Sequence, residues 1–343
     1  MAYTTIKKPS DYFNTKLYNG TGANQSITGV GFQPDFTWIK IRTTGFNHRL
    51  QDSVRGATKS LYTNLTNAEQ TNTDGVLSFD TDGFSLGDDA TNGSFNRSGD
   101  TFVSWNWLGG GTASSNTDGS ITSTVSANTT SGFSIVKWSG NGTLPSTIGH
   151  GLGVAPKMII VKQITANTYS WLVYHQEIGN THYLALNTTD AKDNSVNLWG
   201  NTSPTSSVFT VNHVATNASG VDYIAYCFAE KKGFSKFGSY TGNGNADGTF
   251  VYTGFKPAFV MTKRTDGADW WGMWDSKRDS FNEATKHLRA NASDAENPKS
   301  IDILSNGFKL RNTDPATNAS GGSYIYMCFA SEPLIGDNPT TAR

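Results

Sequence analysis

The chain has few charged residues and few cysteines. Only 16% of its 343 residues are charged, and the formal net charge is −1. A protein that binds nucleic acid through phosphates needs an excess of Lys and Arg, so this balance argues against nucleic-acid binding. The two cysteines, Cys227 and Cys328, cannot build a disulfide framework. They fall at equivalent positions of two sequence repeats, and we expect buried free thiols rather than a bond between them.

Long apolar runs and known catalytic motifs are also missing. No stretch is long enough to span a bilayer, and the first residues carry no basic-then-apolar signal, which predicts synthesis in a reducing cytosol and no membrane insertion. The six histidines show no metal-ligand spacing. No nucleophile elbow, phosphate loop or dinucleotide fingerprint occurs either, so no metal site, no cofactor and no catalytic residue is predicted.

Short apolar runs separated by Gly, Asn and Asp turns are abundant, which is typical of an all-β protein. One such stretch occurs three times, at residues 31–42, 153–162 and 254–264. Each copy contains a turn fixed by Gly and Pro, then an apolar strand that ends in a cation. A Ser-Gly turn followed by an aromatic strand closes each copy, at Gly99, Gly220 and Gly321.

The distance from each Pro (34, 156, 257) to the Gly of the closing turn is nearly constant, at about 64 residues. This spacing predicts three tandem homologous antiparallel β-sandwich domains, jelly-roll-like in type, which lie in a row or around a pseudo-threefold axis. The second copy diverges, because His175 and its neighbours replace an Asp-Ser-x-Arg turn of the other two. The predicted segments are an N-terminal docking arm (1–15), repeats at 16–108, 119–230 and 231–333, a Gly/Ser/Asn linker (109–118) and a C-terminal tail (334–343).

Carboxylates offer two alternatives to a purely structural chain. The sequence Asp80-Thr81-Asp82-Gly83 resembles the start of a calcium loop, but its position between apolar runs favours a hairpin turn. A glycan depolymerase would need a pair of carboxylates, for example Glu69 with Asp82 or Asp275 with Glu296. Related acidic residues recur in two copies, which favours ion pairs of the scaffold.

The segment 270–274, Trp-Trp-Gly-Met-Trp, is the most suggestive local feature. In a strand, Trp270 and Trp274 face away from Trp271 and Met273. One face enters the core, and the other presents an indole pair to a glycan or to a subunit interface. Burial between domains or in a homo-oligomer is the alternative, and the enrichment of Trp in interfaces favours it.

Several motifs give the chain a family resemblance. They are MAYTTIKKPSDYF (1–13), GFQPD (31–35), SVRGA (53–57), SYTGNG (239–244) and NGFKLR (306–311). Together they resemble marine bacteriophage virion proteins, a group of uncharacterised repeated β domains labelled tail fibre or structural protein. The resemblance covers nearly the whole chain and implies a location on the virion surface. The absence of heptads and collagen repeats argues against a long shaft.

The resemblance and the repeats together predict a non-enzymatic virion structural protein, a tail fibre or short knob that attaches to a host-surface glycan or protein. A head decoration or other assembly protein is the alternative. Other virion proteins and copies of the chain itself, as a trimer, are the expected partners. Because binding residues should lie where the copies differ, the expected ligand contacts are Trp270, Trp274, His175, Asp88 and Arg97. The expected docking residues of the arm are Lys7, Lys8, Tyr12 and Phe13.

Overall fold

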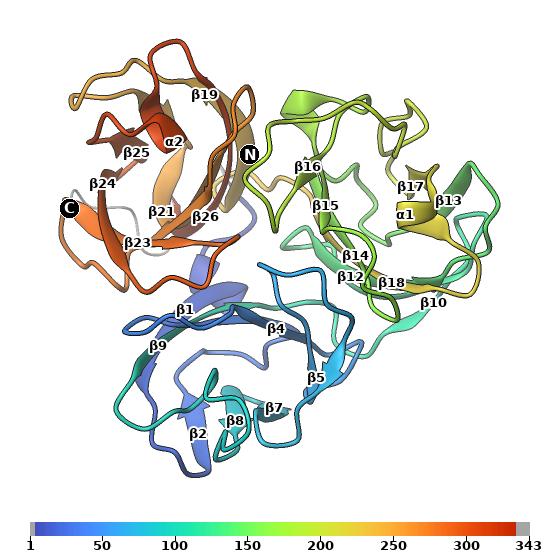
Figure 1. Cartoon of the computed structure of the whole chain (residues 1–343), viewed down its shortest axis with the longest axis horizontal. Coiled ribbons are helices and arrows are strands. Elements are labelled where there is room, and N and C mark those ends of the chain that lie inside the picture. Colours follow the sequence, from blue (N-terminus) through green and yellow to red (C-terminus); the bar gives the residue numbers. More distant parts are fainter. Residues whose placement is uncertain (1–3, 334–343) are drawn as a thin grey trace.

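The computed structural model describes residues 4–333, and these residues are nearly all β (Figure 1). They form 26 strands, two single-turn α-helices and two short 3-10 helices. The strands within each sheet pair antiparallel, for example β1 with β9, β12 with β18 and β19 with β26. The all-β prediction is therefore confirmed.

The chain forms three lobes, one for each sequence repeat, arranged around a common centre (Figure 1). The first contains η1 (Pro9–Asp11), β1 (Phe13–Asn19), β2 (Gln25–Thr28), β3 (Phe36–Ile41), β4 (Arg49–Asp52), β5 (Lys59–Ser60), β6 (Gln70–Thr71), β7 (Val76–Asp80), β8 (Gly83–Leu86) and β9 (Thr101–Trp107).

The second lobe contains β10 (Ser114–Asn116), β11 (Ser123–Asn128), β12 (Phe133–Ser139), β13 (Ser146–Gly149), β14 (Met158–Gln163), β15 (Leu172–His175), η2 (Gln176–Ile178), β16 (Leu184–Ala185), β17 (Val208–Val211), α1 (Val214–Asn217) and β18 (Asp222–Phe228). The third contains β19 (Ser235–Thr241), β20 (Phe250–Tyr252), β21 (Phe255–Arg264), β22 (Trp271–Asp275), β23 (Ala284–Arg289), β24 (Asn297–Leu304), β25 (Gly307–Leu310), α2 (Pro315–Asn318) and β26 (Ser323–Pro333).

The same strand order recurs in each lobe. The inner sheets run β1-β9-β3-β4, β12-β18-β14-β15 and β19-β26-β21-β22. In every case the strand after the Ser-Gly turn (β9, β18, β26) lies between the strand of the Pro turn (β3, β14, β21) and an earlier strand of the same lobe (β1, β12, β19). The predicted Asp-Gly hairpin is also present, since β7 and β8 pair with Asp80 opposite Gly83.

Each inner sheet is covered on both faces, which explains the continuous apolar runs in the sequence. In β3 and β14 every residue is buried. Side chains alternate between the faces, so that Trp38 enters a central core while Ile39 and Ile41 enter a core that belongs to the first lobe alone. The other two lobes have outer cores of the same kind.

The central core is built jointly by all three lobes. At its middle lie three rings from equivalent positions of β9, β18 and β26. Trp107 contacts Phe228 with 6.4 Å between ring centroids and Phe329 with 5.5 Å, and the two phenylalanines lie 6.0 Å apart. The repeats are therefore not three separately packed domains in a row: they surround a pseudo-threefold axis and share one core.

Two predicted boundaries need correction. The N-terminal arm is not free for docking, because Ile6 and Phe13 are buried in the central core and Phe13 already begins β1. The linker 109–118 is not structureless either. It contains β10, which adds to the sheet of the second lobe. The predicted C-terminal tail, 334–343, lies outside the described residues.

Candidate functional site

One kind of backbone hydrogen bond recurs at all three junctions between the lobes. A backbone N–H of each lobe donates to a backbone carbonyl just after the Pro-turn strand of the next lobe. Glu69 donates to Ile164 (2.9 Å), Lys192 to Thr265 (3.0 Å) and Glu296 to Arg42 (2.9 Å). These three bonds run from the first lobe to the second, to the third and back to the first. The ring of repeats is closed within a single chain.

A second ring of bonds runs deeper, from aromatic N–H groups. The indole of Trp171 donates to the carbonyl of Tyr62 (2.8 Å), and the indole of Trp271 donates to that of Ala185 (2.9 Å). His48 occupies the equivalent position in the first lobe, with Nε2 2.9 Å from the carbonyl of Arg289. Nδ1 of His48 accepts from the indole of Trp38, so Nε2 carries the proton. Burial, followed by nearby Lys40, holds the pKa of His48 well below its usual value.

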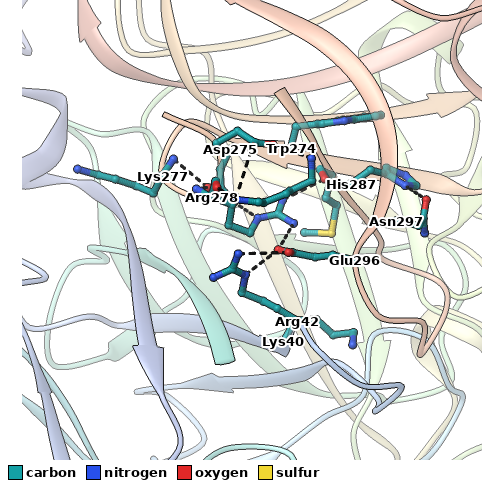
Figure 2. A network of polar contacts seen from close by, with 12 residues as sticks. Lys40, Arg42, Trp274, Asp275, Lys277, Arg278, His287, Glu296 and Asn297 are labelled. Carbon is teal, nitrogen blue, oxygen red and sulfur yellow. Dashed lines mark hydrogen bonds and ion pairs between the residues drawn. The ribbon is translucent and has the colours of Figure 1, made fainter. Parts of the chain in front are cut away.

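The Asp-Ser-x-Arg turns supply buried charge at two junctions. Figure 2 shows the junction of the third and first lobes, where Nε of Arg278 lies 2.5 Å from Oδ2 of Asp275. The same carboxylate accepts from the indole of Trp105 in the first lobe (3.0 Å). Asp52 and Arg55 repeat this arrangement at the next junction, where the hydroxyl of Tyr226 is the donor (2.7 Å). Each buried carboxylate thus has an arginine within its own lobe and an aromatic donor from the following lobe.

Three of the four carboxylates considered for a depolymerase, Glu69, Asp275 and Glu296, belong to these networks. Glu296 bonds Arg42 across the junction at 2.7 Å and lies 3.3 Å from Arg278 (Figure 2). Glu69 pairs with Arg55 at 3.1 Å. Asp82, the carboxylate paired with Glu69 in that alternative, lies in the β7–β8 turn and accepts from the backbone N–H groups of Gly29 and Gly31, which follow β2. The geometry therefore gives Asp275, Glu296 and Glu69 structural partners.

His175 stands where the other two lobes have Asp52 and Asp275. Met327 of the next lobe holds the place of Tyr226 and Trp105 and lines the same small cavity as His175, and a thioether cannot donate a hydrogen bond. A carboxylate here would lack the aromatic donor that Asp52 and Asp275 receive from the next lobe. The imidazole is instead neutral, since burial lowers its pKa to about 4, and Nε2 bonds the carbonyl of Tyr326 at 3.3 Å. His175 has no exposed surface, so it cannot contact a ligand directly.

The tryptophan pair requires a second correction. Alternation is as predicted, because Trp271 and Met273 enter the central core. Trp270 and Trp274 face the opposite way, but they are only 8% and 0% exposed and belong to the outer core of the third lobe. His287 packs on both indoles, at 4.2 and 4.8 Å between ring centroids. The pair cannot bind a glycan, because the sheet that carries it is covered on both faces.

The other predicted site residues are scattered. Asp88 and Arg97 are exposed on the outer loops of the first lobe, where Arg97 pairs with Asp100 at 2.6 Å and lies over the ring of Phe46. Lys7 and Lys8 are exposed at the junction of the first and third lobes, and Lys8 pairs with Asp11. Tyr12 packs on Phe234, and Phe13 stacks on Phe329. The structure brings none of these sets to one surface with the tryptophans.

A buried lysine recurs at the end of each Pro-turn strand. Lys40, Lys162 and Lys263 are all 0% exposed, and each ammonium donates to the carbonyl of the residue after it, at 2.7, 2.9 and 2.7 Å. Burial lowers the pKa of Lys40 to about 7 and that of the other two to about 8. The sequence predicted these cations at the edge of the core, but they are buried inside the protein. Their lowered pKa values make them easier to deprotonate than an exposed lysine.

We expect Lys40 to make stability depend on pH. Below pH 7 the folded and unfolded chains both carry the proton, and burying the charge costs free energy. Between about pH 7 and 10.5 the unfolded chain binds more protons, so this cost disappears as the pH rises. We therefore expect urea unfolding to show that the stability advantage of Lys40→Met over the wild type is about 4 kcal/mol larger at pH 6 than at pH 10.5. A difference that stays constant with pH would show that the ammonium is not desolvated.

The groove that is best suited to a ligand lies between the second and third lobes. It has a volume of about 520 Å³, and its walls include η2, β19 and β20. Phe250 and Tyr252 of β20 line it and are 44% and 51% exposed, while Glu177 and Glu230 supply exposed carboxylates. The sequence signal for it was the alternation of aromatic residues in 250–252. This signal is weak beside the cluster of tryptophans at 270–274.

Within residues 4–333, no helix is long and apolar enough to cross a membrane, and no group of three or more His, Cys, Asp or Glu residues is placed to hold a metal ion. Cys227 and Cys328 are buried free thiols, as predicted. The features above define an all-β chain of three repeats closed around a shared core, with its buried charges at the junctions.

The chain belongs to a domain family of unknown function, DUF7483, whose family model matches residues 8–333. The match therefore begins in the N-terminal arm and ends with β26, so the family unit includes all three lobes. A search of curated proteins and a search of solved structures each found no match.

Proposed function

We propose that this protein is a non-enzymatic structural protein of a bacteriophage virion that lies on the particle surface and attaches it to the host cell. The motif resemblance described above suggests the virion. The observation that supports the attachment role is that the buried charges and the exposed aromatic rings have different places in the fold. Asp52, Asp275, Glu69 and Glu296 are engaged in holding the lobes together, whereas exposed aromatic side chains line an open groove.

A rigid body suits this role, because a receptor-binding surface loses less free energy on binding when it is organised beforehand. The two rings of hydrogen bonds and the shared core fix the lobes relative to one another. The surface groove between the second and third lobes is then held in one shape.

A head decoration protein is the second candidate, favoured by a different surface. Phe281 is 80% exposed, next to a pocket of about 390 Å³ at the junction of the third and first lobes. Four lysines line this pocket: Lys7, Lys8, Lys256 and Lys277. An exposed ring beside clustered cations fits an acidic neighbour in a shell.

Cryo-electron microscopy of the intact virion tests both proposals. We expect density for the three-lobed body at the tail tip or on a projecting fibre, with Phe250 and Tyr252 facing outward. Purified protein should then also reduce adsorption of virions to host cells by competition. Density spread over the head lattice, with Phe281 in a contact, would support decoration instead. Absence of the chain from purified virions would contradict both.

A further inference from the structure

The groove beside β19 lies at the junction of the second and third lobes, along the edge of the first strand of the third lobe. In the second lobe, the outer edge of β12 is covered by β11, and β10 follows it. In the first lobe, residues 7–10 of the arm line the pocket beside β1. The third lobe has only residues 230–234 before its first strand, β19. No strand within residues 4–333 pairs with this edge of β19, so the groove beside it is open to a ligand.

The edge of β12 is paired with the strand β11 of the same chain, but the equivalent edge of β19 is poorly suited to pair with an added polypeptide strand. The backbone groups of Ile135 in β12 face Ser126 of β11. Their equivalents in β19 are already engaged: the carbonyl of Phe237 accepts from the Gln176 side chain at 2.7 Å, and its N–H donates to Glu230 at 3.3 Å. These side chains close the edge against strand addition.

The side chains that remain form an aromatic wall and a polar floor. Phe250 and Tyr252 are two residues apart in one strand, so they project from the same face of β20. Lys236 fixes the position of Tyr252 by two contacts. Its ammonium donates to the Tyr252 carbonyl at 3.3 Å and lies 5.4 Å from the centroid of the Tyr252 ring. Both rings keep a large exposed surface without packing on the core.

The floor depends on Gly238. A Cβ at this position would lie 2.6 Å from the hydroxyl of Tyr326, so only glycine leaves room for the phenol there. Burial, with smaller contributions from Cys328, Glu230 and Glu177, raises the pKa of Tyr326, which keeps the phenol protonated and able to donate. Glu177 and Ser239, which bond each other at 3.0 Å, add an acceptor and a hydroxyl at the rim.

We infer that this groove binds a neutral carbohydrate, with the apolar face of a sugar ring on Phe250 and Tyr252 and its hydroxyls on Glu177, Glu230 and Tyr326. The C–H face of a hexose packs on the electron-rich face of an aromatic ring, and its hydroxyls donate to carboxylates. The volume of about 520 Å³ is in the range of small-molecule sites. Two carboxylates against one lysine disfavour an acidic glycan. The ligand class rests on the proposed attachment role, but the groove can be tested without the virion.

The experiment uses the full chain and an array of neutral, N-acetylated and acidic di- and trisaccharides, followed by calorimetric titration with the best neutral binder. We expect binding by the wild type and a loss of affinity of about tenfold or more in Phe250→Ala/Tyr252→Ala. Tyr252→Phe keeps the ring and should bind like the wild type. Phe281→Ala removes an exposed ring elsewhere and should also leave affinity unchanged. Thermal unfolding of each variant confirms that it is folded.

Equal affinity of the double variant and the wild type would overturn the inference, as would binding of acidic glycans alone or of no sugar at all. Binding of extended peptides instead would place a protein partner in the groove and would also overturn it. Failure of the attachment role looks different. In that case the purified chain binds the sugar through Phe250 and Tyr252, but virions carrying the double variant adsorb to host cells as well as the parent does.

Discussion

Replacing Asp275 with alanine is expected to destabilise the protein by about 3–5 kcal/mol, because it leaves the buried Arg278 without its main counter-charge. The change also removes the acceptor of the Trp105 indole, a bond that joins the third lobe to the first. Both side chains of the ion pair are 0% exposed, so solvent cannot replace the lost partner. Chemical denaturation followed by tryptophan fluorescence and circular dichroism measures the effect.

Asp294→Ala is the matched control for Asp275→Ala. Its carboxylate also pairs with an arginine, Arg289, but the two side chains are 52% and 31% exposed. Its loss should cost less than about 1 kcal/mol. Replacing both members of the buried pair, Asp275→Ala with Arg278→Met, should recover part of the stability, because no unpaired charge remains. Similar losses in Asp275→Ala and Asp294→Ala would contradict the role assigned to the junction.

Trp107→Ala is expected to cost about 3–5 kcal/mol and to weaken all three lobes together. Trp107 is 1% exposed and contacts Phe228 and Phe329, which come from the other two lobes. A cavity at this position removes packing from each lobe at once. Hydrogen exchange should therefore show faster exchange in β9, β18 and β26 alike.

Trp138→Ala provides the comparison for Trp107→Ala. Trp138 is similarly buried, at 2% exposure, but it packs in the outer core of the second lobe, against Phe209 and Tyr223. Faster exchange in this variant should be concentrated in the second lobe. If Trp107→Ala accelerated exchange only in the first lobe, the shared core would not couple the repeats.

Some features of this fold depend only on residues that are close together in the sequence, and others depend on contacts between distant segments. The Pro-turn strands, the Asp-Gly hairpin and the alternation in 270–274 depend on neighbouring residues, so the sequence predicts them. Exposure of Trp270 and Trp274 could not be predicted, because it depends on a second layer of protein over the sheet. His287 and the outer core supply this layer from other strands.

The environment of His175 also depends on a residue that is distant in the sequence. Its divergence from Asp52 and Asp275 is visible in the sequence and suggested a binding residue. Its physical reason is Met327, which lies 152 positions away along the chain and faces His175 only when the lobes close around the axis. His175 therefore differs from its equivalents because its partner residue in the next lobe differs. The residues that follow it, Gln176 and Glu177, line the groove between the second and third lobes.

The sequence by itself determined an all-β chain, its three repeats, the hairpin turns and the free buried thiols, because turn chemistry and alternation act over a few residues. Only the tertiary structure decided that the repeats share one core, that three lysines are buried and that exposed aromatic rings line a groove between the second and third lobes. Those outcomes depend on which faces of distant strands meet, and the free energy of burying them is a property of the closed ring and not of any single repeat.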